Sequence, residues 1–281
     1  MFRGFLRALL IGASVWGSAA LAATSVSAAP KTNAKVDVEA LRAELESGEE
    51  GRMLSALAEL STHGKDLPEA ANLLRGVLER GASVPVIEAA LSVASLLARA
   101  ELSEAVARYT RHRSPSVRLT ATRTLGATGG TAAIPALRAA LRSADAAVRG
   151  AAAEGLGRLG AKEAVGELFL ALDRRVLQAA SAIGRLCAPP ECLALSERLG
   201  RVPLEAMTDG IDHILLRSAS EMPDEHKVKV IARVAALATA DAARYLVGVA
   251  NRWPAGDAGK ARRALKDAIE SLGEKDPLKK P

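Results

Sequence analysis

The sequence predicts an all-α protein built as a solenoid of stacked antiparallel helix pairs. Aromatic residues make up only 2% of the 281 residues, while alanine and leucine dominate. Small and straight-chain apolar residues favour helices over strands. Apolar residues also recur at helical spacing along most of the chain, and one segment of 31 residues is repeated without a gap. Such repetition is typical of architectures in which each unit packs on its neighbours.

The N-terminus has the pattern of a secretory signal peptide. Arg3 and Arg7 form a short positive region, residues 8–30 carry no charge, and small residues precede two candidate cleavage sites, after Ala22 and after Ala28. We expect cleavage after Ala28, with the earlier site and an uncleaved membrane anchor as alternatives. The expected location is therefore the bacterial periplasm or the outside of the cell.

Four parts are expected along the chain. They are a signal peptide (1–28), a flexible linker (29–35), a helical repeat domain (36–272) and a disordered tail (273–281). Without the signal peptide the chain has 36 basic and 32 acidic residues, a mild excess of +4, and only four aromatic residues. Nucleic-acid binding usually needs a basic patch and aromatic platforms, so no nucleic-acid partner is expected.

Helix pairs are expected through the whole repeat domain, six or seven in number. Gly64 and Gly81 mark the turn and the end of an early pair, and prolines open two later helices, as suits a first helical turn. Outside the repeat the expected ranges are 53–81, 88–112 with a break near 99–101, 203–219, 223–240, 241–252 and 257–272.

The repeat itself consists of residues 114–144 and 145–175, in which ten of 31 aligned positions are identical. Ser114 and Asp145 stand where a helix N-cap is expected, before helices that end at Gly129 and Gly160. Second helices follow, with Ile134, Leu137 and Leu141 in one unit and Val165, Leu168 and Leu172 in the next.

A Val-Arg pair opens the first helix of each unit. Val117 and Val148 are expected to pack in the core. Arg118 and Arg149 are expected to bridge neighbouring repeats through Asp145 or through helix C-termini, where cations are favourable.

Residues 145–173, DAAVRGAAAEGLGRLGAKEAVGELFLALD, resemble the HEAT-repeat superfamily in its short bacterial form. The likeness lies in the order of Asp, Val-Arg, Ala-rich spacing and Leu-Gly, and it is specific for residues 114–173. It implies a right-handed stack of helix pairs whose second helices line a concave side, and a binding role in most members. Some relatives carry out chemistry, so the resemblance alone does not exclude an enzyme.

The second helices would then carry the partner surface. The residue after each central leucine faces away from the core, which selects Arg138 and Phe169, with Arg142 one turn on and Arg108 on a preceding helix. Arginine and aromatic residues are common interface anchors. Our hypothesis is that Arg108, Arg138, Arg142 and Phe169 form a strip that receives an acidic, partly apolar segment. The alternative is a core position for Phe169 and ordinary solvated arginines.

The only two cysteines lie in GRLCAPPEC, at Cys187 and Cys192. The repeat places Cys187 where Gly160 ends a helix, and two prolines stop one helix and open the next. In an oxidising compartment, four intervening residues allow a disulfide across this joint. Two free thiols and a redox or metal site are the alternatives.

No motif for catalysis, a metal or a cofactor is found, and none of these is expected. Asp209 and His213 lie one helical turn apart, but two ligands are too few for a metal site. The expected function is an exported, monomeric, non-enzymatic scaffold that binds a protein or peptide on the concave face. The alternatives are an enzyme on a helical frame and a self-associating structural protein of the cell envelope.

Overall fold

The computed structural model describes residues 36–255 and 258–273. The proposed signal peptide, the linker, residues 256–257 and the tail from residue 274 lie outside this described part. Within it, regular structure is helical, with fifteen α-helices, three short 3-10 helices and one isolated bridge between Leu199 and Val202. The all-α prediction is confirmed.

The helices are short and closely spaced along the chain. The α-helices are α1 (Val38–Glu46), α2 (Glu50–His63), α3 (Ala70–Arg80), α4 (Val84–Leu97), α5 (Ser103–Tyr109), α6 (Pro115–Thr128), α7 (Ala133–Ala140), α8 (Ala146–Arg158), α9 (Val165–Asp173), α10 (Ala179–Leu186), α11 (Pro189–Ser196), α12 (Leu204–Leu215), α13 (Asp224–Ala235), α14 (Ala240–Asn251) and α15 (Lys260–Ser271). The 3-10 helices are η1 (Gly64–Asp66), η2 (Ala100–Leu102) and η3 (Lys162–Ala164).

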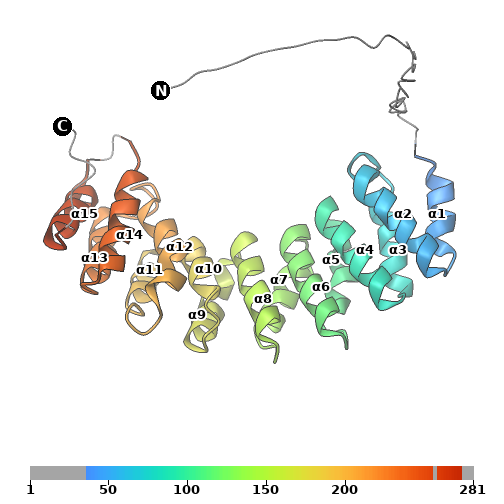
Figure 1. Ribbon diagram of the computed structural model, residues 1–281, viewed down its shortest axis with the longest axis horizontal. Coiled ribbons are helices and arrows are strands. Elements are labelled where there is room, and N and C mark those ends of the chain that lie inside the picture. Colours follow the sequence, from blue (N-terminus) through green and yellow to red (C-terminus); the bar gives the residue numbers. More distant parts are fainter. Residues whose placement is uncertain (1–35, 256–257, 274–281) are drawn as a thin grey trace, which may run out of the picture. The chain divides into compact units, whose positions relative to one another are not determined.

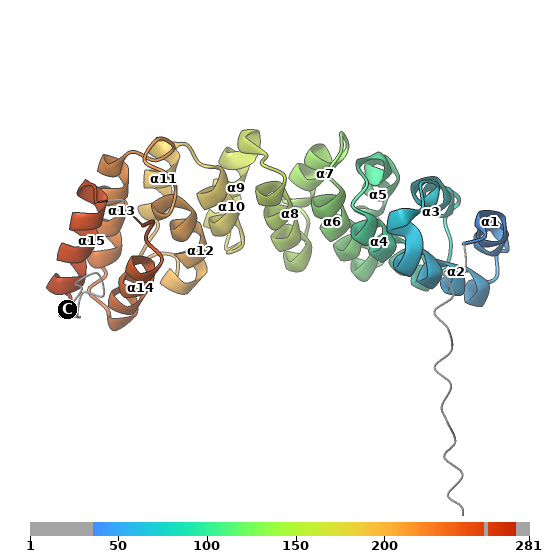
Figure 2. The same ribbon diagram turned by 90° about the horizontal axis from the view of Figure 1, so that it is seen from above.

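The helices form a row of pairs in two layers (Figure 1). Grouped in sequence order as the repeat is, the helices after α1 form seven successive pairs in the described part of the chain, which are α2/α3, α4/α5, α6/α7, α8/α9, α10/α11, α12/α13 and α14/α15. Figure 2 shows the even-numbered first helices in one layer and the odd-numbered second helices in the other through the middle of the row. This is the stacked architecture that the sequence predicts, and it is an α-solenoid.

Local chemistry sets the helix ends of the repeat. The Asp145 carboxylate accepts from the backbone N–H groups of Ala147 and Val148, and so caps α8. Gly129 and Gly160 follow α6 and α8 with φ of 66° and 72°, which only glycine adopts without cost. Each first helix therefore starts and stops where the repeat pattern places its boundaries.

A continuous apolar core runs between the two layers. In α6 the side chains of Val117, Ala121 and Leu125 are fully buried, and Leu137 of α7 is buried against them in the same core. The equivalent residues of α8 and α9 are buried as well, so each pair is stabilised chiefly by its neighbours. None of the described helices is long and apolar enough to cross a bilayer.

The first helices of the middle pairs approach through small residues. A methyl group added at Gly126 of α6 would lie 2.8 Å from the Cα of Gly155 in α8, and one added at Gly157 would lie 2.9 Å from the Cα of Ala182 in α10. In the Leu-Gly dipeptide of the repeat, the leucine side chain is thus buried in the core, and the glycine that follows it allows the close approach of two helix backbones. Larger residues there would push the first helices apart.

The second helices of the middle pairs are more widely spaced. Close packing joins α6 to α8, α8 to α10 and α10 to α12, but α7, α9 and α11 are separated by grooves. In the middle of the stack, the second helices are therefore farther apart than the first helices. The family resemblance implied the reverse, because helices that line a concave side lie closer together. Further along, the relation reverses, since α13 and α15 pack closely.

Candidate functional site

A groove opens between α7 and α9, with a volume of about 480 Å³. We call it the α7–α9 groove. Its polar lining includes four arginines and one glutamate, and its apolar lining comes mainly from α9 and the segment after it. These residues are Arg138, Arg142, Arg149, Arg174 and Glu167, with Leu141, Leu170, Ala171 and Val176.

One ion pair spans the α7–α9 groove. Arg138 of α7 donates from Nε and Nη2 to the two carboxylate oxygens of Glu167 in α9, at 2.9 Å and 2.7 Å. This hydrogen bonding raises the pKa of Arg138 above its ordinary value, and the carboxylate charge adds to the effect. The pair is partly open to solvent, with side chains 41% and 29% exposed, so it links two repeats without a large stability gain.

The other arginines are placed differently. Arg149 donates from Nη1 to the carbonyl oxygens of Ser143 and Ala144, and so holds the loop between α7 and α8. The side chains of Arg142 and Arg174 make no hydrogen bond or ion pair within residues 36–255 and 258–273. They leave uncompensated positive charge at the mouth of the groove.

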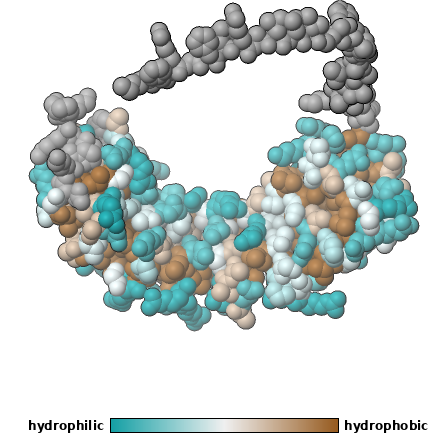
Figure 3. Space-filling model, viewed as in Figure 1, coloured by the Kyte–Doolittle hydropathy of each residue, from teal (hydrophilic) through white to brown (hydrophobic). Residues whose placement is uncertain are grey.

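An exposed leucine lies among these charges. Leu170 is 59% exposed, while its helix neighbours Leu168 and Leu172 are completely buried. A large apolar side chain in water is informative when it lines a groove with polar groups around it. On the face shown in Figure 3, apolar and polar side chains are interspersed along the row of helices.

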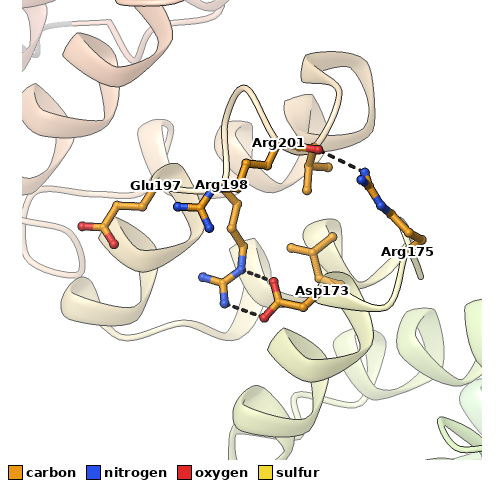
Figure 4. A pocket seen from close by; sticks show the side chains of 7 residues that line it. Asp173, Arg175, Glu197, Arg198 and Arg201 are labelled. Atoms are coloured by element: carbon orange, nitrogen blue, oxygen red, sulfur yellow. Dashed lines mark hydrogen bonds and ion pairs between the residues drawn. The ribbon is translucent and has the colours of Figure 1, made fainter.

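A second groove, of about 400 Å³, lies on the other side of α9, and we call it the α9–α11 groove (Figure 4). Here Arg198 donates to both carboxylate oxygens of Asp173, at 2.8 Å and 3.0 Å. This hydrogen bonding lowers the pKa of Asp173 below its ordinary value. The Arg198 guanidinium also lies 4.4 Å from the centre of the Phe169 ring, which it covers.

Two further arginines line the α9–α11 groove. Arg175 donates from Nη1 to the carbonyl oxygen of Arg201 at 3.0 Å. Figure 4 shows the Arg201 side chain pointing away from Arg175, toward Glu197. Arg175 has a φ of 67°, a left-handed backbone conformation that is costly for a residue with a Cβ.

The structure brings together only part of the strip expected from the sequence. Arg138 and Arg142 share the α7–α9 groove, whereas Phe169 is half-buried beneath Arg198 on the other side of α9. Arg108 is exposed on α5 and lines neither groove. Sequence reasoning missed the residues that face Arg138 and Arg142 from α9 and its C-terminal end, because it followed only one position per helix. They are Glu167, Leu170 and Arg174.

The Val-Arg pairs link successive repeats. Arg118 of α6 donates from Nη1 to the carbonyl oxygens of His112 and Arg113, just after the preceding second helix, and its Nη2 lies 3.9 Å from Asp145. Together with the equivalent contacts of Arg149, these bonds satisfy loop carbonyls that would otherwise depend on water.

The structure joins Cys187 and Cys192 in a disulfide, with their Cα atoms 5.3 Å apart. Both cysteines are buried at the joint between α10 and α11. Arg217 donates to the carbonyl oxygens of Gly184 and Cys187, at 2.6 Å and 2.7 Å, and so satisfies the C-terminal end of α10. Lys227, which is fully buried, donates in turn to the Arg217 carbonyl oxygen.

A polar cluster lies on the side of the first helices, across α10 and α12. Ser181 donates to Asp209, whose Oδ2 is 3.7 Å from Nε2 of His213, and Arg185 contacts that same nitrogen at 2.9 Å. In a Ser-His-Asp relay the histidine stands between serine and carboxylate. Here the carboxylate stands between them, so the cluster lacks that order. In the described part of the chain, no three potential metal-ligating side chains of the His, Cys, Asp and Glu types come together.

Comparison with known proteins identifies repeats in the middle of the chain. Residues 102–184 match the model of HEAT repeats. Among solved structures, the chain is similar to the complex of CpcE and CpcF of phycocyanin lyase from Nostoc sp. PCC7120, with 18% identity over 88% of this chain and 99% of that one and a TM-score of 0.48. It is also similar to an engineered protein, with 18% identity over 85% and 97% of the two chains and a TM-score of 0.26. No curated protein matches the chain.

Proposed function

This chain carries HEAT repeats over residues 102–184, and from that premise we propose that it is a non-enzymatic scaffold that binds an acidic, partly apolar peptide segment of another protein in the α7–α9 groove. The observation that carries the proposal is the combination of uncompensated arginines with an exposed leucine in one groove. Stacked helical repeats offer extended surfaces of this kind for binding.

Charge complementarity selects the partner. Arg142 and Arg174 make no hydrogen bond or ion pair within the described residues, so they can pair with carboxylates, and guanidinium groups do so with two parallel hydrogen bonds. Leu170 and the apolar floor beside it would receive an apolar side chain of the same segment. Because Arg138 is already paired with Glu167, the first contacts of an incoming segment would be made by Arg142 and Arg174.

The proposal includes export. The N-terminal pattern of Arg3, Arg7, an uncharged apolar run and small residues up to Ala28 supports delivery to the periplasm or the outside of the cell. The disulfide between Cys187 and Cys192 fits an oxidising compartment. Intact-mass analysis of the protein recovered from periplasm would show loss of residues 1–28. Recovery of the full-length chain from the cytoplasm would contradict export.

A charge-reversal experiment tests the binding role. The probe is a fluorescein-labelled peptide of alternating glutamate and leucine, and fluorescence anisotropy measures its affinity. The double variant Arg142→Glu/Arg174→Glu should lose binding by roughly a hundredfold, since two interface arginines are reversed. Neither side chain makes a hydrogen bond within the described residues, so folding should be unaffected.

A matched control separates the groove from general electrostatics. The double variant Arg123→Glu/Arg233→Glu changes the net charge by the same amount at exposed positions of α6 and α13. It should bind the peptide nearly as well as the unaltered protein. Equal losses in the two double variants, or no binding of the peptide to the unaltered protein, would contradict the proposed site.

A further inference from the structure

Two consecutive arginines at the C-terminal end of α9 face different grooves. Arg174 lines the α7–α9 groove, and Arg175 lines the α9–α11 groove. The two grooves therefore lie on either side of this helix end, and the Arg174-Arg175 dipeptide supplies one guanidinium to each of them. A chain passing over the end of α9 would meet positive charge on both sides of it.

The backbone at Arg175 is held in an arrangement that normally requires glycine. The N–H of Val176 donates to the carbonyl oxygen of Ala171 and the N–H of Arg175 to that of Leu172, which is the hydrogen-bond pattern of a Schellman helix end. The residue with positive φ in that pattern is Arg175, at 67°. A Cβ is disfavoured there, because left-handed backbone brings it too close to the following carbonyl oxygen.

The preceding helix of the same repeat shows the unstrained solution. At the end of α8 the same two hydrogen bonds run from Ala161 to Leu156 and from Gly160 to Gly157. There the residue with positive φ is Gly160, at 72°. The two helix ends thus have the same geometry, with glycine in one and arginine in the other. Strain of this kind points to a role for the side chain that carries it.

We propose that Arg174 and Arg175 form a two-sided clamp over which one extended acidic segment passes, with carboxylates entering the α7–α9 groove and the α9–α11 groove. This inference rests on the proposed function and specifies its partner, a segment with two acidic clusters separated by a short spacer. Arg201 lines the second groove and has no hydrogen bond to its side chain within residues 36–255 and 258–273, so it supplies further positive charge there.

The clamp also gives the strained backbone a function. The bond from Arg175 to the Arg201 carbonyl oxygen directs its side chain across the α9–α11 groove, toward the loop that follows α11. Glycine would relieve the backbone but remove the guanidinium. Affinity for a two-cluster segment therefore favours arginine at position 175, whereas stability of the folded backbone favours glycine.

The experiment compares two fluorescein-labelled peptides by anisotropy. One has a single Glu-Leu-Glu cluster, and the other has two such clusters joined by a Gly-Ser spacer. The two-cluster peptide should bind the unaltered protein at least roughly tenfold more tightly than the single-cluster peptide, because the second contact becomes intramolecular. Arg175→Gly should remove most of that gain.

Thermal melting guards against loss of fold. Arg175→Gly should melt at the same temperature as the unaltered protein or higher, since it relieves the left-handed strain. Ala98→Gly is the matched control, because Ala98 has a φ of 50° at the end of α4 and lies on another repeat. It should change neither affinity.

Two results would overturn the clamp while leaving the proposed function intact. One is equal affinity of the two peptides for the unaltered protein, and the other is retention of the full gain in Arg175→Gly. Failure of both peptides to bind the unaltered protein would overturn the proposed function together with the clamp. The two failures are thus distinguishable in one set of titrations.

Discussion

Gly184 of α10 and Gly210 of α12 lie in backbone contact, such that a methyl group at position 184 would overlap the carbonyl oxygen of Gly210. The atom in the way is backbone, which cannot rotate aside as a flexible side chain can. The contact brings α10 and α12 together on the side of the first helices, opposite the grooves. In the middle of the stack, the first helices thus approach closely on one side, while the second helices are more widely spaced on the other.

Gly184→Ala should therefore destabilise the protein. Adding a methyl group forces the two helices apart, and overpacking of this kind costs about 1–3 kcal/mol or more. The free energy of unfolding in urea measures the loss. Gly248→Ala in α14 is the control, since a methyl group there meets nothing within 4 Å. It should stabilise by up to about 1 kcal/mol through helix propensity, and a similar gain for Gly184→Ala would contradict the contact.

The helix pairs could be predicted from the sequence because their signals are local. Caps such as Asp145, helix-ending glycines such as Gly160 and apolar spacing act within one repeat. The tight approach of Gly184 and Gly210 depends on two residues 26 positions apart in the sequence and is visible only once the helices are stacked. The sequence alone does not say which glycines meet.

The grooves could be predicted only in part for a similar reason. Helical periodicity identifies Arg138 and Phe169 as facing away from the core, but not which neighbour each one meets. In the structure Arg138 meets Glu167, and Phe169 is covered by Arg198 of the next repeat. These partners depend on the spacing between helices, which is set by packing on the opposite side of the stack.

The disulfide should make a moderate contribution to stability. Closing a loop across a sequence separation of five restricts the unfolded chain by about 2 kcal/mol in the loop-entropy model. Replacement of Cys187 and Cys192 by alanine should lower the free energy of unfolding by about that amount, as measured in urea. Arg217 still holds the end of α10 in the variant, so the helical circular dichroism should not change.

Reduction offers an independent check on that prediction. Dithiothreitol should shift the urea midpoint of the unaltered protein toward that of the double alanine variant and leave the variant's own midpoint in place. Equal midpoints for the unaltered protein with and without the reductant would show that the disulfide contributes nothing measurable.

His213 should make stability depend on pH. Burial, reinforced by Arg185, lowers the pKa of His213 in the folded state. The unfolded chain therefore binds the proton more tightly than the folded protein does. The contribution of His213 to the free energy of unfolding is full above the unfolded pKa of about 6.5, and it is lost as the pH falls from there through the lower pKa of the folded state. The Arg185 guanidinium, which can only donate, needs an unprotonated Nε2 on His213 for their 2.9 Å contact.

His213→Gln keeps an acceptor for Arg185 and removes the titration. The drop in melting temperature between about pH 7.5 and about pH 5 should be smaller in this variant than in the unaltered protein. His63→Gln is the control, because His63 is exposed at the end of α2. If His213→Gln and the unaltered protein lose the same stability on acidification, His213 does not govern this range.

Glu167 should act as an internal competitor in the α7–α9 groove. Its carboxylate occupies Nε and Nη2 of Arg138, the positions that a partner carboxylate would otherwise take. Glu167→Gln removes the negative charge and frees Arg138 without changing the side-chain size. Affinity for the glutamate-leucine peptide should rise by roughly threefold to tenfold, and its salt dependence should become steeper because one more charge pair forms.

The structural cost of this variant should be small. The Arg138–Glu167 pair is partly solvated, and such pairs contribute up to about 1 kcal/mol. Glu154→Gln on α8 is the matched control, since Glu154 is exposed and lines a hollow on the side of the first helices. Glu154→Gln changes the net charge by the same amount and should leave affinity nearly constant. Weaker binding by Glu167→Gln would contradict competition and would mean that Glu167 positions Arg138 for the partner. In that case the affinity lost when the Arg138 side chain becomes mobile would exceed the affinity gained by removing the competing carboxylate.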